Sequence, residues 1–369
     1  MGVKRYVAES DNTITNAFEA NLTTRGTGSN MGAADTLEVF TIHGQTSASV
    51  SATTAEQARV LIQFPVSGTN TAIETIHRDR TNGDIPTNGN VSFYLRMFNA
   101  PHAETLPENF DLDIKKMTAA WSEGTGLDMD EYQDIGFSSW AKRNSTTAWS
   151  AAGAEGNYSN ITSTTFSDGS EDIEVDVTST VEAWLSSPTS NYGFMIRNTN
   201  AQISGSVGSF YTKKFFARGT EFHFKRPVIE VRWDSSRKDQ RSNFILSSSL
   251  VSAANNVNTL WLYNRLRGVL TDVPSLTSNA MDVTVYSASL DGVPYGDAVT
   301  LIKADGTSVT SVTAGKATEK GVVLTGIYTA SFTTANTAST FLDVWSTGSG
   351  DSKRTFHTGS LTPVSQEAS

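Results

Sequence analysis

The sequence predicts an all-β chain that folds into two β-sandwich domains. Many segments alternate apolar and polar residues with period two, which is the pattern of strands that bury one face. Apolar residues make up 38% and charged residues only 18% of the chain, a composition typical of all-β surface proteins rather than of helical enzymes. The length of 369 residues exceeds that of a single sandwich, so more than one domain is expected.

The first half of the chain contains the clearest alternation. Strands are expected at 37–42, at the more apolar and central 59–64, and at 91–97 and 110–114. A shift of one residue would turn each apolar face outward, so the register is well specified. One short helix is expected after Ser179, because Ser179 and Glu182 have capping-box spacing ahead of an apolar stripe.

Residues 118–156 are too long for an ordinary connection, so we expect a functional or self-packed loop. Trp121, Trp140 and Trp149 lie in it among glycine and acidic residues. Tryptophan rings either stack on sugar faces or anchor a core, because the side chain offers a large apolar area. The sequence leaves both interpretations open.

The acidic part of this loop offers oxygen ligands for calcium, a hard cation that binds several carboxylate and carbonyl oxygens. The spacing does not fit an EF-hand, and a solvated acidic loop is the alternative. Calcium is therefore the one cofactor that the sequence leaves open. The candidate ligands are Glu123, Asp128, Asp130 and Asp134.

A second set of side chains suits a polysaccharide. Exposed aromatic rings would stack on sugars, and a basic patch near one sheet edge would meet an acidic glycan. The same basic residues also suit a solvated face or pairing with the acidic loop. The candidate glycan-binding residues are Tyr132, Trp140, Tyr158, Arg197, Lys213, Lys214 and Arg218.

Several classes of function are disfavoured. The net charge of −10 disfavours direct binding of nucleic acid, which needs basic grooves. Without cysteine the chain forms no disulfide and no cysteine-ligated zinc site. No long apolar run predicts membrane insertion, and no apolar segment after Met1 predicts a secretory signal, so synthesis in the cytoplasm is expected. The five histidines are scattered and no Gly-x-Ser-x-Gly motif occurs, so we do not expect an enzyme.

Seven motifs, in order, resemble the DNRLRE module over roughly residues 10–235. The resemblance implies a jelly-roll β-sandwich, as found on bacterial surface and polysaccharide-active proteins and in tailed-phage virion proteins. Some members of that family bind alginate, an acidic glycan. The motifs are Gly32-x-x-Asp-Thr-Leu-x-Val39, Arg59-x-Leu-Ile-x-Phe64, Trp121-x-Glu-Gly-x-Gly-x-Asp128 followed by Trp140 and Trp149 ahead of a glycine, Val175-Asp-Val-Thr178, Trp184, Asn191-Tyr-Gly-Phe194 and Arg226-Pro-x-x-Glu-Val-x-Trp233.

The remaining third of the chain predicts a second sandwich. Asp291-Gly292 and Asp305-Gly306 are hairpin-turn pairs between strand-like runs. Gly326-x-Tyr328-x-Ala-x-Phe332 resembles the tyrosine-bearing strand of immunoglobulin-like domains. The expected divisions are a DNRLRE-like domain at 1–236, a polar linker at 237–257, an immunoglobulin-like sandwich at 258–362 and a flexible tail at 363–369.

Together these features predict a non-enzymatic structural protein of a tailed-phage virion, located in capsid decoration, neck, tail or baseplate. It would contact other virion proteins through sheet edges or sandwich faces, as a homo-oligomer or symmetric assembly, and this role is compatible with a face turned to the host surface. The alternative is a carbohydrate-binding module or adhesin that recognises an acidic polysaccharide. A calcium-stiffened bacterial surface protein is a third hypothesis.

Overall fold

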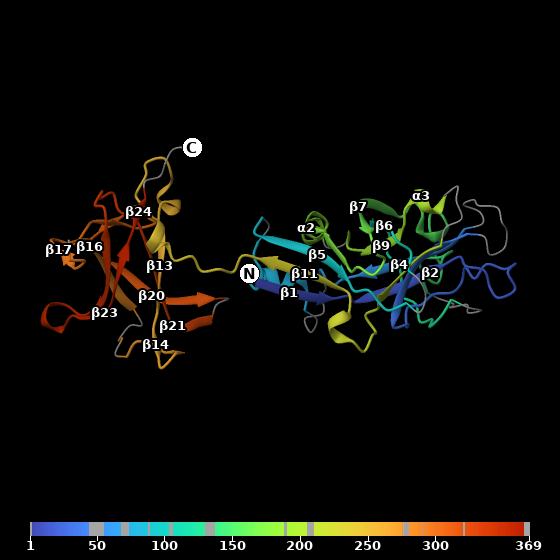
Figure 1. Cartoon of the computed structure of the whole chain (residues 1–369), viewed down its shortest axis with the longest axis horizontal. Coiled ribbons are helices and arrows are strands. Elements are labelled where there is room, and N and C mark those ends of the chain that lie inside the picture. The colour runs from blue at the N-terminus through green and yellow to red at the C-terminus, as the bar shows by residue number, and fades with distance from the viewer. Residues whose placement is uncertain are drawn as a thin grey trace. The chain divides into compact units, whose positions relative to one another are not determined.

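The computed structural model shows an all-β protein whose chain divides into two compact units, Met1–Ser235 and Ser236–Ser369 (Figure 1). The division falls one residue from the predicted end of the first domain at 236. No helix in the described part of the chain is long and apolar enough to cross a membrane. The structure describes residues 2–43, 55–67, 74–87, 89–102, 106–129, 137–187, 190–204, 210–274, 276, 280–289, 291–319 and 322–364.

Two antiparallel sheets build the first unit. Sheet A has the strand order β1–β11–β5–β8, and sheet B has the order β10–β3–β4–β9–β6–β7, with β2 pairing β4. The strands of sheet A are β1 (Gly2–Val7), β11 (Val228–Trp233), β5 (Val91–Met97) and β8 (Ile173–Asp176). The strands of sheet B are β10 (Phe210–Phe216), β3 (Thr36–Ile42), β4 (Glu56–Gln63), β9 (Phe194–Asn198), β6 (Phe110–Met117), β7 (Tyr158–Phe166) and β2 (Ser10–Thr15).

The main core of this unit lies between the two sheets. Phe93 and Leu95 of sheet A and Leu112 and Ile114 of sheet B are fully buried in it. The alternation predicted at 91–97 is confirmed, because every second residue of β5 from Val91 on is buried and the others are partly exposed. Burial of such side chains contributes roughly 1.5–3 kcal/mol each.

Sheet B is covered on its other face as well. A second cluster there contains Ile14, Leu61 and Met195 from the strands, packed against tryptophans of the loop that follows β6. As a result every residue of β9 is buried, and β4 is buried at every position except Gln63. The fold is therefore a sandwich of two sheets with a loop layer on the outside of sheet B.

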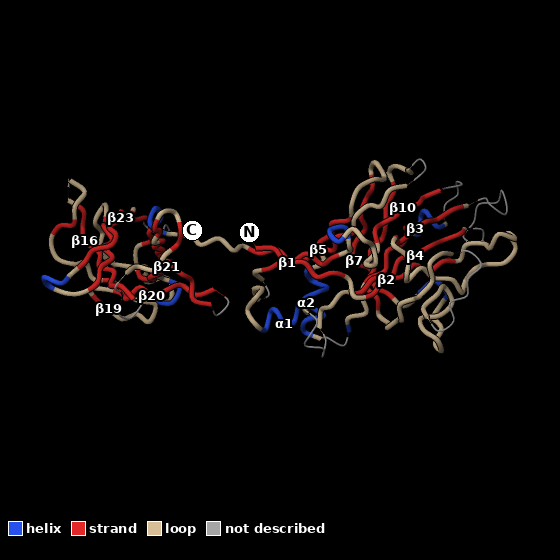
Figure 2. Tube along the Cα trace, turned by 90° about the horizontal axis from the view of Figure 1, so that it is seen from below, coloured by secondary structure: helices blue, strands red, loops and turns tan. Residues whose placement is uncertain are grey.

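The first unit also contains short helices. α1 (Ile76–Thr81) and α2 (Thr178–Ser186) lie side by side (Figure 2). Arg80 and Glu182 join them through paired hydrogen bonds of 2.5 and 2.7 Å. The predicted helix is confirmed, but its predicted cap is wrong, because Val177 is the N-cap and no side chain caps the helix. The remaining helical segments are α3 (Asn200–Ile203) and the 3₁₀ turns η1 (Ala152–Ala154), η3 (His223–Lys225), η4 (Gln240–Asn243), η5 (Ala253–Asn255) and η6 (Gly350–Ser352).

The second unit is built around sheet C, which has the order β13–β21–β20–β16–β22–β23, with β17 pairing β16. Short two-stranded pairs accompany it: β12–β24, β14–β15 and β18–β19. The strands of sheet C are β13 (Asn258–Tyr263), β21 (Val322–Phe332), β20 (Val312–Glu319), β16 (Ala280–Ala288), β22 (Phe341–Thr347), β23 (Arg354–Leu361) and β17 (Pro294–Tyr295). The short strands are β12 (Phe244–Ile245), β24 (Pro363–Val364), β14 (Arg265–Leu266), β15 (Val269–Leu270), β18 (Leu301–Ile302) and β19 (Ser308–Val309).

Tyr328 is central to the second core. Its ring is fully buried on β21, and its hydroxyl oxygen accepts the backbone N–H of Val273 at 2.9 Å. The segment that resembles an immunoglobulin strand is thus confirmed as a strand. The described strands of sheet C follow one continuous order and do not separate into the two sheets of an immunoglobulin domain. The immunoglobulin-like order therefore stays a prediction, and so does the jelly-roll order of the first unit.

The predicted linker at 237–257 is wrong, because much of this segment belongs to the second unit. Phe244 is fully buried in the second core, and β12 pairs in parallel with β24. Arg241 binds the buried carboxylate of Asp343 through hydrogen bonds of 2.9 to 3.3 Å. The predicted flexible tail is likewise corrected at Pro363–Val364, which is β24, while 365–369 lie outside the described residues.

We predict that Tyr328→Phe lowers the free energy of unfolding of the second unit by about 1–3 kcal/mol, because it leaves the N–H of Val273 buried without an acceptor. Chemical denaturation of the full chain measures the change. Tyr263→Phe is the matched control, since Tyr263 is 41% exposed, and it should change stability by less than about 0.5 kcal/mol. Equal effects of the two substitutions would contradict the assigned hydrogen bond.

Candidate functional site

The loop between β6 and β7 is self-packed over the outer face of sheet B. The indole N–H of Trp121 donates to the carbonyl of Tyr192 at 2.9 Å, and that of Trp149 donates to the carbonyl of Ser139 at 2.8 Å. Both tryptophans pack on the second cluster of the first unit. The self-packed alternative of the sequence prediction is therefore confirmed for the described parts of the loop, 118–129 and 137–157.

Trp140 was expected on an exposed face, and this expectation is wrong. Its ring is only 7% exposed and packs in the cluster under the loop. The guanidinium of Arg59 lies 4.7 Å from its ring centroid, a cation–π contact between two buried groups. Gly153 permits this packing, because a Cβ atom at that position would come within 2.7 Å of the indole. Trp140 is thus a core anchor rather than a sugar platform.

Two buried arginines share one carboxylate beneath the same loop. Arg59 and Arg197 both bind Oε1 of Glu155, at 2.9 and 2.5 Å. The hydroxyl of Tyr158 donates to the other oxygen of Glu155 and accepts from Arg197 at 2.9 Å. Burial, together with the positive charge of Arg197, lowers the pKa of Arg59 to about 10. Two of the predicted glycan ligands, Tyr158 and Arg197, are therefore used inside this cluster.

The predicted basic patch is also wrong, because its members lie on opposite faces of sheet B. Lys213 faces the core between the sheets and is fully buried, whereas Lys214 pairs with Glu38 at 2.7 Å. Consecutive residues of a strand must point to opposite faces. Arg218 lies beyond β10 and is bound to Glu123, so for this residue the alternative of pairing with the acidic loop is confirmed. The remaining candidate, Tyr132, lies outside the described residues.

The carboxylate of Glu123, a proposed calcium ligand, is occupied by protein donors. Arg218 binds its two oxygens at 2.6 and 2.5 Å, and the backbone N–H of Asp11 donates to it at 2.8 Å. Asp128 is exposed, and Asp130 and Asp134 lie outside the described residues. Within the described ranges no group of three His, Cys, Asp or Glu side chains is placed to hold a metal ion. Glu123 therefore fastens the loop instead of presenting a ligand.

Asp11 lies at the centre of the contact between Glu123 and Arg218 and is 1% exposed. One of its oxygens accepts the backbone N–H of Arg218 at 2.6 Å. Burial raises the pKa of Asp11 to about 7, and Glu123 adds to the rise, although Arg218 opposes it. This contact joins β2, the loop after β6 and the segment after β10. Protonation of Asp11 therefore affects how the loop after β6 is held on the outer face of sheet B.

The first candidate for a functional surface is the edge of sheet B at β7. This strand ends the sheet order and pairs with β6 in the described structure. Most of its residues are exposed, and its sequence Tyr158–Phe166 has no charged residue and no proline. Natural edge strands are usually protected by charge, proline or a bulge that prevents further pairing. β7 has a register shift opposite Ile114 and Lys115, but no charge blocks its outer side.

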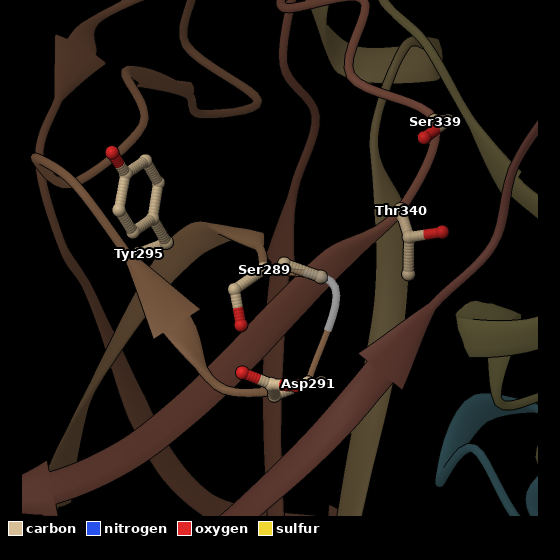
Figure 3. A pocket seen from close by; sticks show the side chains of 7 residues that line it. Ser289, Asp291, Tyr295, Ser339 and Thr340 are labelled. Atoms are coloured by element: carbon tan, nitrogen blue, oxygen red, sulfur yellow. The ribbon is translucent and has the colours of Figure 1, made fainter.

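The second candidate is a polar pocket of about 730 Å³ in the second unit. Ser289, Asp291 and Tyr295 come from the hairpin between β16 and β17, and Ser339 and Thr340 come from the segment that enters β22 (Figure 3). The predicted turn at Asp291-Gly292 is confirmed, since Gly292 has a φ of 70° and donates to the carbonyl of Ser289 at 3.0 Å. Hydroxyls, a carboxylate and an exposed ring can bind a small polar molecule.

Sequence reasoning found neither surface as a site, for different reasons. The edge at β7 follows from strand order, which no local pattern of Ser and Thr reveals. The pocket joins residues that are about fifty positions apart, such as Ser289 and Thr340. The Asp291-Gly292 pair predicted a hairpin turn at this place, but it did not predict that the hairpin forms one wall of a pocket.

We predict that Asp11→Asn changes how stability depends on pH. The folded-state pKa of about 7 lies above the ordinary 3.8, so the contribution of Asp11 is fully present below pH about 4 and is lost as the pH rises through 7. The advantage of the wild type over the variant should therefore shrink by up to about 4 kcal/mol between pH 4 and 8. Denaturation curves at several pH values measure it. A constant difference would show that Asp11 titrates normally.

A scan of the chain against protein-family models found no match, and a search of curated proteins found no similar sequence. The two surfaces that can carry a function in the described part of the chain are the uncharged edge at β7 and the polar pocket of the second unit.

Proposed function

We propose that this chain is a non-enzymatic structural protein of a tailed-phage virion that assembles through protein–protein contacts. The observation that carries the proposal is the edge strand β7. In the part of the chain that the structure describes, no further strand pairs with the outer side of β7, and addition of a strand there would supply affinity through main-chain hydrogen bonds. A second copy of this chain or another virion protein would supply that strand.

An exposed hairpin in the second unit gives independent support. Leu266 and Val269 pair in the β14–β15 hairpin and are 63% and 67% exposed. Its turn is formed by Arg267 and Gly268, which have φ values of 51° and 85°. Two bulky apolar side chains at the tip of one hairpin gain free energy when a partner covers them. This arrangement suits a subunit contact.

The use of ionisable groups also fits a structural role. Arg80 is held by Glu182, Arg218 by Glu123 and Arg241 by Asp343. These pairs fix helices, loops and the start of the second unit. His102 accepts the backbone N–H of Lys214 at 2.9 Å, so its ring also positions a strand. Charges that are committed to such contacts support a scaffold more than they support a reaction centre.

A second candidate function is glycan binding, and the pocket of the second unit favours it. The ring of Tyr295 is 70% exposed, and the same pocket is lined by Ser289, Asp291 and Thr340. A sugar would stack on the ring and share hydrogen bonds with the polar groups. Because Asp291 would repel an anion, this pocket suits an uncharged glycan better than the acidic polysaccharide expected from the sequence.

We predict that Thr162→Lys on β7 reduces incorporation of the chain into particles by at least about tenfold, because a charge on an edge strand opposes strand addition. The measurement is the copy number of the chain in purified particles. Ser145→Lys is the matched control, since it adds the same charge on an exposed loop. Incorporation of Thr162→Lys at the wild-type level would refute the role of this edge. Absence of the wild-type chain from particles would refute the virion proposal.

For the second function we predict that Tyr295→Ala weakens binding of a neutral glycan by about tenfold or more, because the stacking surface is removed. An array of neutral and acidic glycans, followed by titration calorimetry, measures it. Tyr263→Ala, which removes another exposed tyrosine of the same unit, should bind normally. If no glycan binds the wild type, or if both variants bind equally, the pocket is not a sugar site.

A further inference from the structure

A lysine lies buried beside an amide group inside the first unit. The side chain of Lys213 on β10 is fully buried. Its Nζ atom donates to Oδ1 of Asn99 and to the carbonyl of Gly169, each at 2.7 Å. The rings of Phe166 and Phe215 lie 4.8 and 5.4 Å from Nζ. Neither hydrogen-bonding partner carries a charge, so this environment favours the neutral amine.

The protonation of Lys213 follows from this burial. Loss of solvent lowers the pKa of Lys213 to about 8, although the carboxylates of Glu171 and Asp172 act to raise it. Near pH 8 about half of the amine is therefore neutral and has a lone pair. A desolvated lysine in this state is a nucleophile.

Asn99 is held in place by its backbone. Its N–H donates to Oδ1 of Asp172 at 2.8 Å, and the residue forms an isolated β-bridge with Phe215, two positions from Lys213. The neighbouring Ala100 donates to the carbonyl of Lys214 at 3.0 Å. The amine and the amide are therefore fixed relative to each other, and such fixed geometry strongly accelerates reaction between two groups.

Glu171 supplies a proton carrier next to this pair. Its Oε1 accepts the backbone N–H groups of Ser167 and Asp168 at 2.6 and 2.8 Å, which fix the carboxylate. Its Oε2 is buried and has no hydrogen-bond partner in the described part of the chain. Burial acts to raise the pKa of Glu171, but the backbone N–H groups and the charge of Lys213 lower it overall, so the group is a carboxylate whose Oε2 has a lone pair for a proton from Nζ. The charge of Glu171 also acts on Lys213.

We propose that Lys213 and Asn99 react with each other to form an intramolecular isopeptide bond. The lone pair of Nζ attacks Cγ of Asn99, a new N–C bond forms, and the Cγ–Nδ2 bond breaks. Glu171 takes a proton from Nζ and passes it to Nδ2, which leaves as ammonia. An amine and a primary amide thus become a secondary amide and ammonia, with no oxidant and no added reactant. The bond would join the segment after β5 of sheet A to β10 of sheet B, whatever partner the protein has.

Lys115 provides a matched control within the same unit. Its Nζ contacts Oδ1 of Asn160 at 2.6 Å, much as Lys213 contacts Asn99. However, Nζ of Lys115 is also paired with the carboxylate of Asp113 at 2.8 Å. An ammonium in a salt bridge has no lone pair with which to attack. Contact between lysine and asparagine alone is therefore not sufficient, and Lys115 should remain unlinked.

Mass spectrometry of the denatured full chain tests the proposal. The wild type should be lighter than its sequence by one ammonia, and trypsin should release peptide 97–115 joined to peptide 198–214. Lys213→Met should have its full sequence mass. Asn99→Asp should lose one water instead of one ammonia, and Glu171→Gln should form the bond more slowly. Lys115→Met should still lose one ammonia.

Two results would overturn the proposal. One is a wild-type chain of full mass with the two tryptic peptides separate. The other is a loss of ammonia that persists in Lys213→Met, which would indicate a succinimide, as Asn82-Gly83 can form. If a variant fails to fold, the wild-type mass and the linked peptides still decide the question.

Discussion

The first unit depends on the burial of sheet B on both faces at β4 and β9. A strand that buries one face can turn its polar residues to water, but these two strands cannot. Arg59 and Arg197, which point away from the main core, therefore need partners beneath the loop after β6. They share Glu155, and Arg59 also donates to the carbonyl of Gly153 at 2.5 Å. Breaking such a buried group of charges would leave an uncompensated arginine, which costs several kcal/mol. The tryptophan-rich loop is thus part of the fold, because it excludes water from this cluster.

The double burial also explains which sequence predictions were correct. Strands whose alternate residues stay partly exposed, such as β5 and most of β6, have a period of two that can be read from the sequence alone. The all-β class and the division of the chain follow from them. The predictions of site residues were wrong because they considered the chemistry of each side chain but not the face of the sheet to which it points. Lys213 and Lys214 are adjacent in a strand, so one of them had to face inward, and Trp140 had to cover β4. Aromatic and basic residues suit a ligand and a core equally well until the facing surface is known.

Other features depend on contacts between distant residues and have no local signal. Phe244 follows a polar segment that resembles a linker, yet its ring packs against Phe332 and Phe341, about ninety positions away. The environment of Asp11 is made by Glu123 and Arg218 from two other segments. The pocket beside Tyr295 and the edge at β7 require the strand order. The sequence determines these arrangements, but neither the hydrophobic period nor the composition of a single segment reveals them.

The pairing of β1 with β11 has a mechanical consequence. Gly2 lies opposite Trp233 and Val7 lies opposite Val228, so the chain reaches β1 at the same end of the ladder at which it leaves β11. Tension applied between the segment before β1 and the segment after β11 would break the hydrogen bonds between the two strands one after another, because the hydrogen bonds of an antiparallel pair lie across the strands. The edge strand would then peel away at low force instead of shearing at high force. A tether attached before Gly2 would therefore act as a release point.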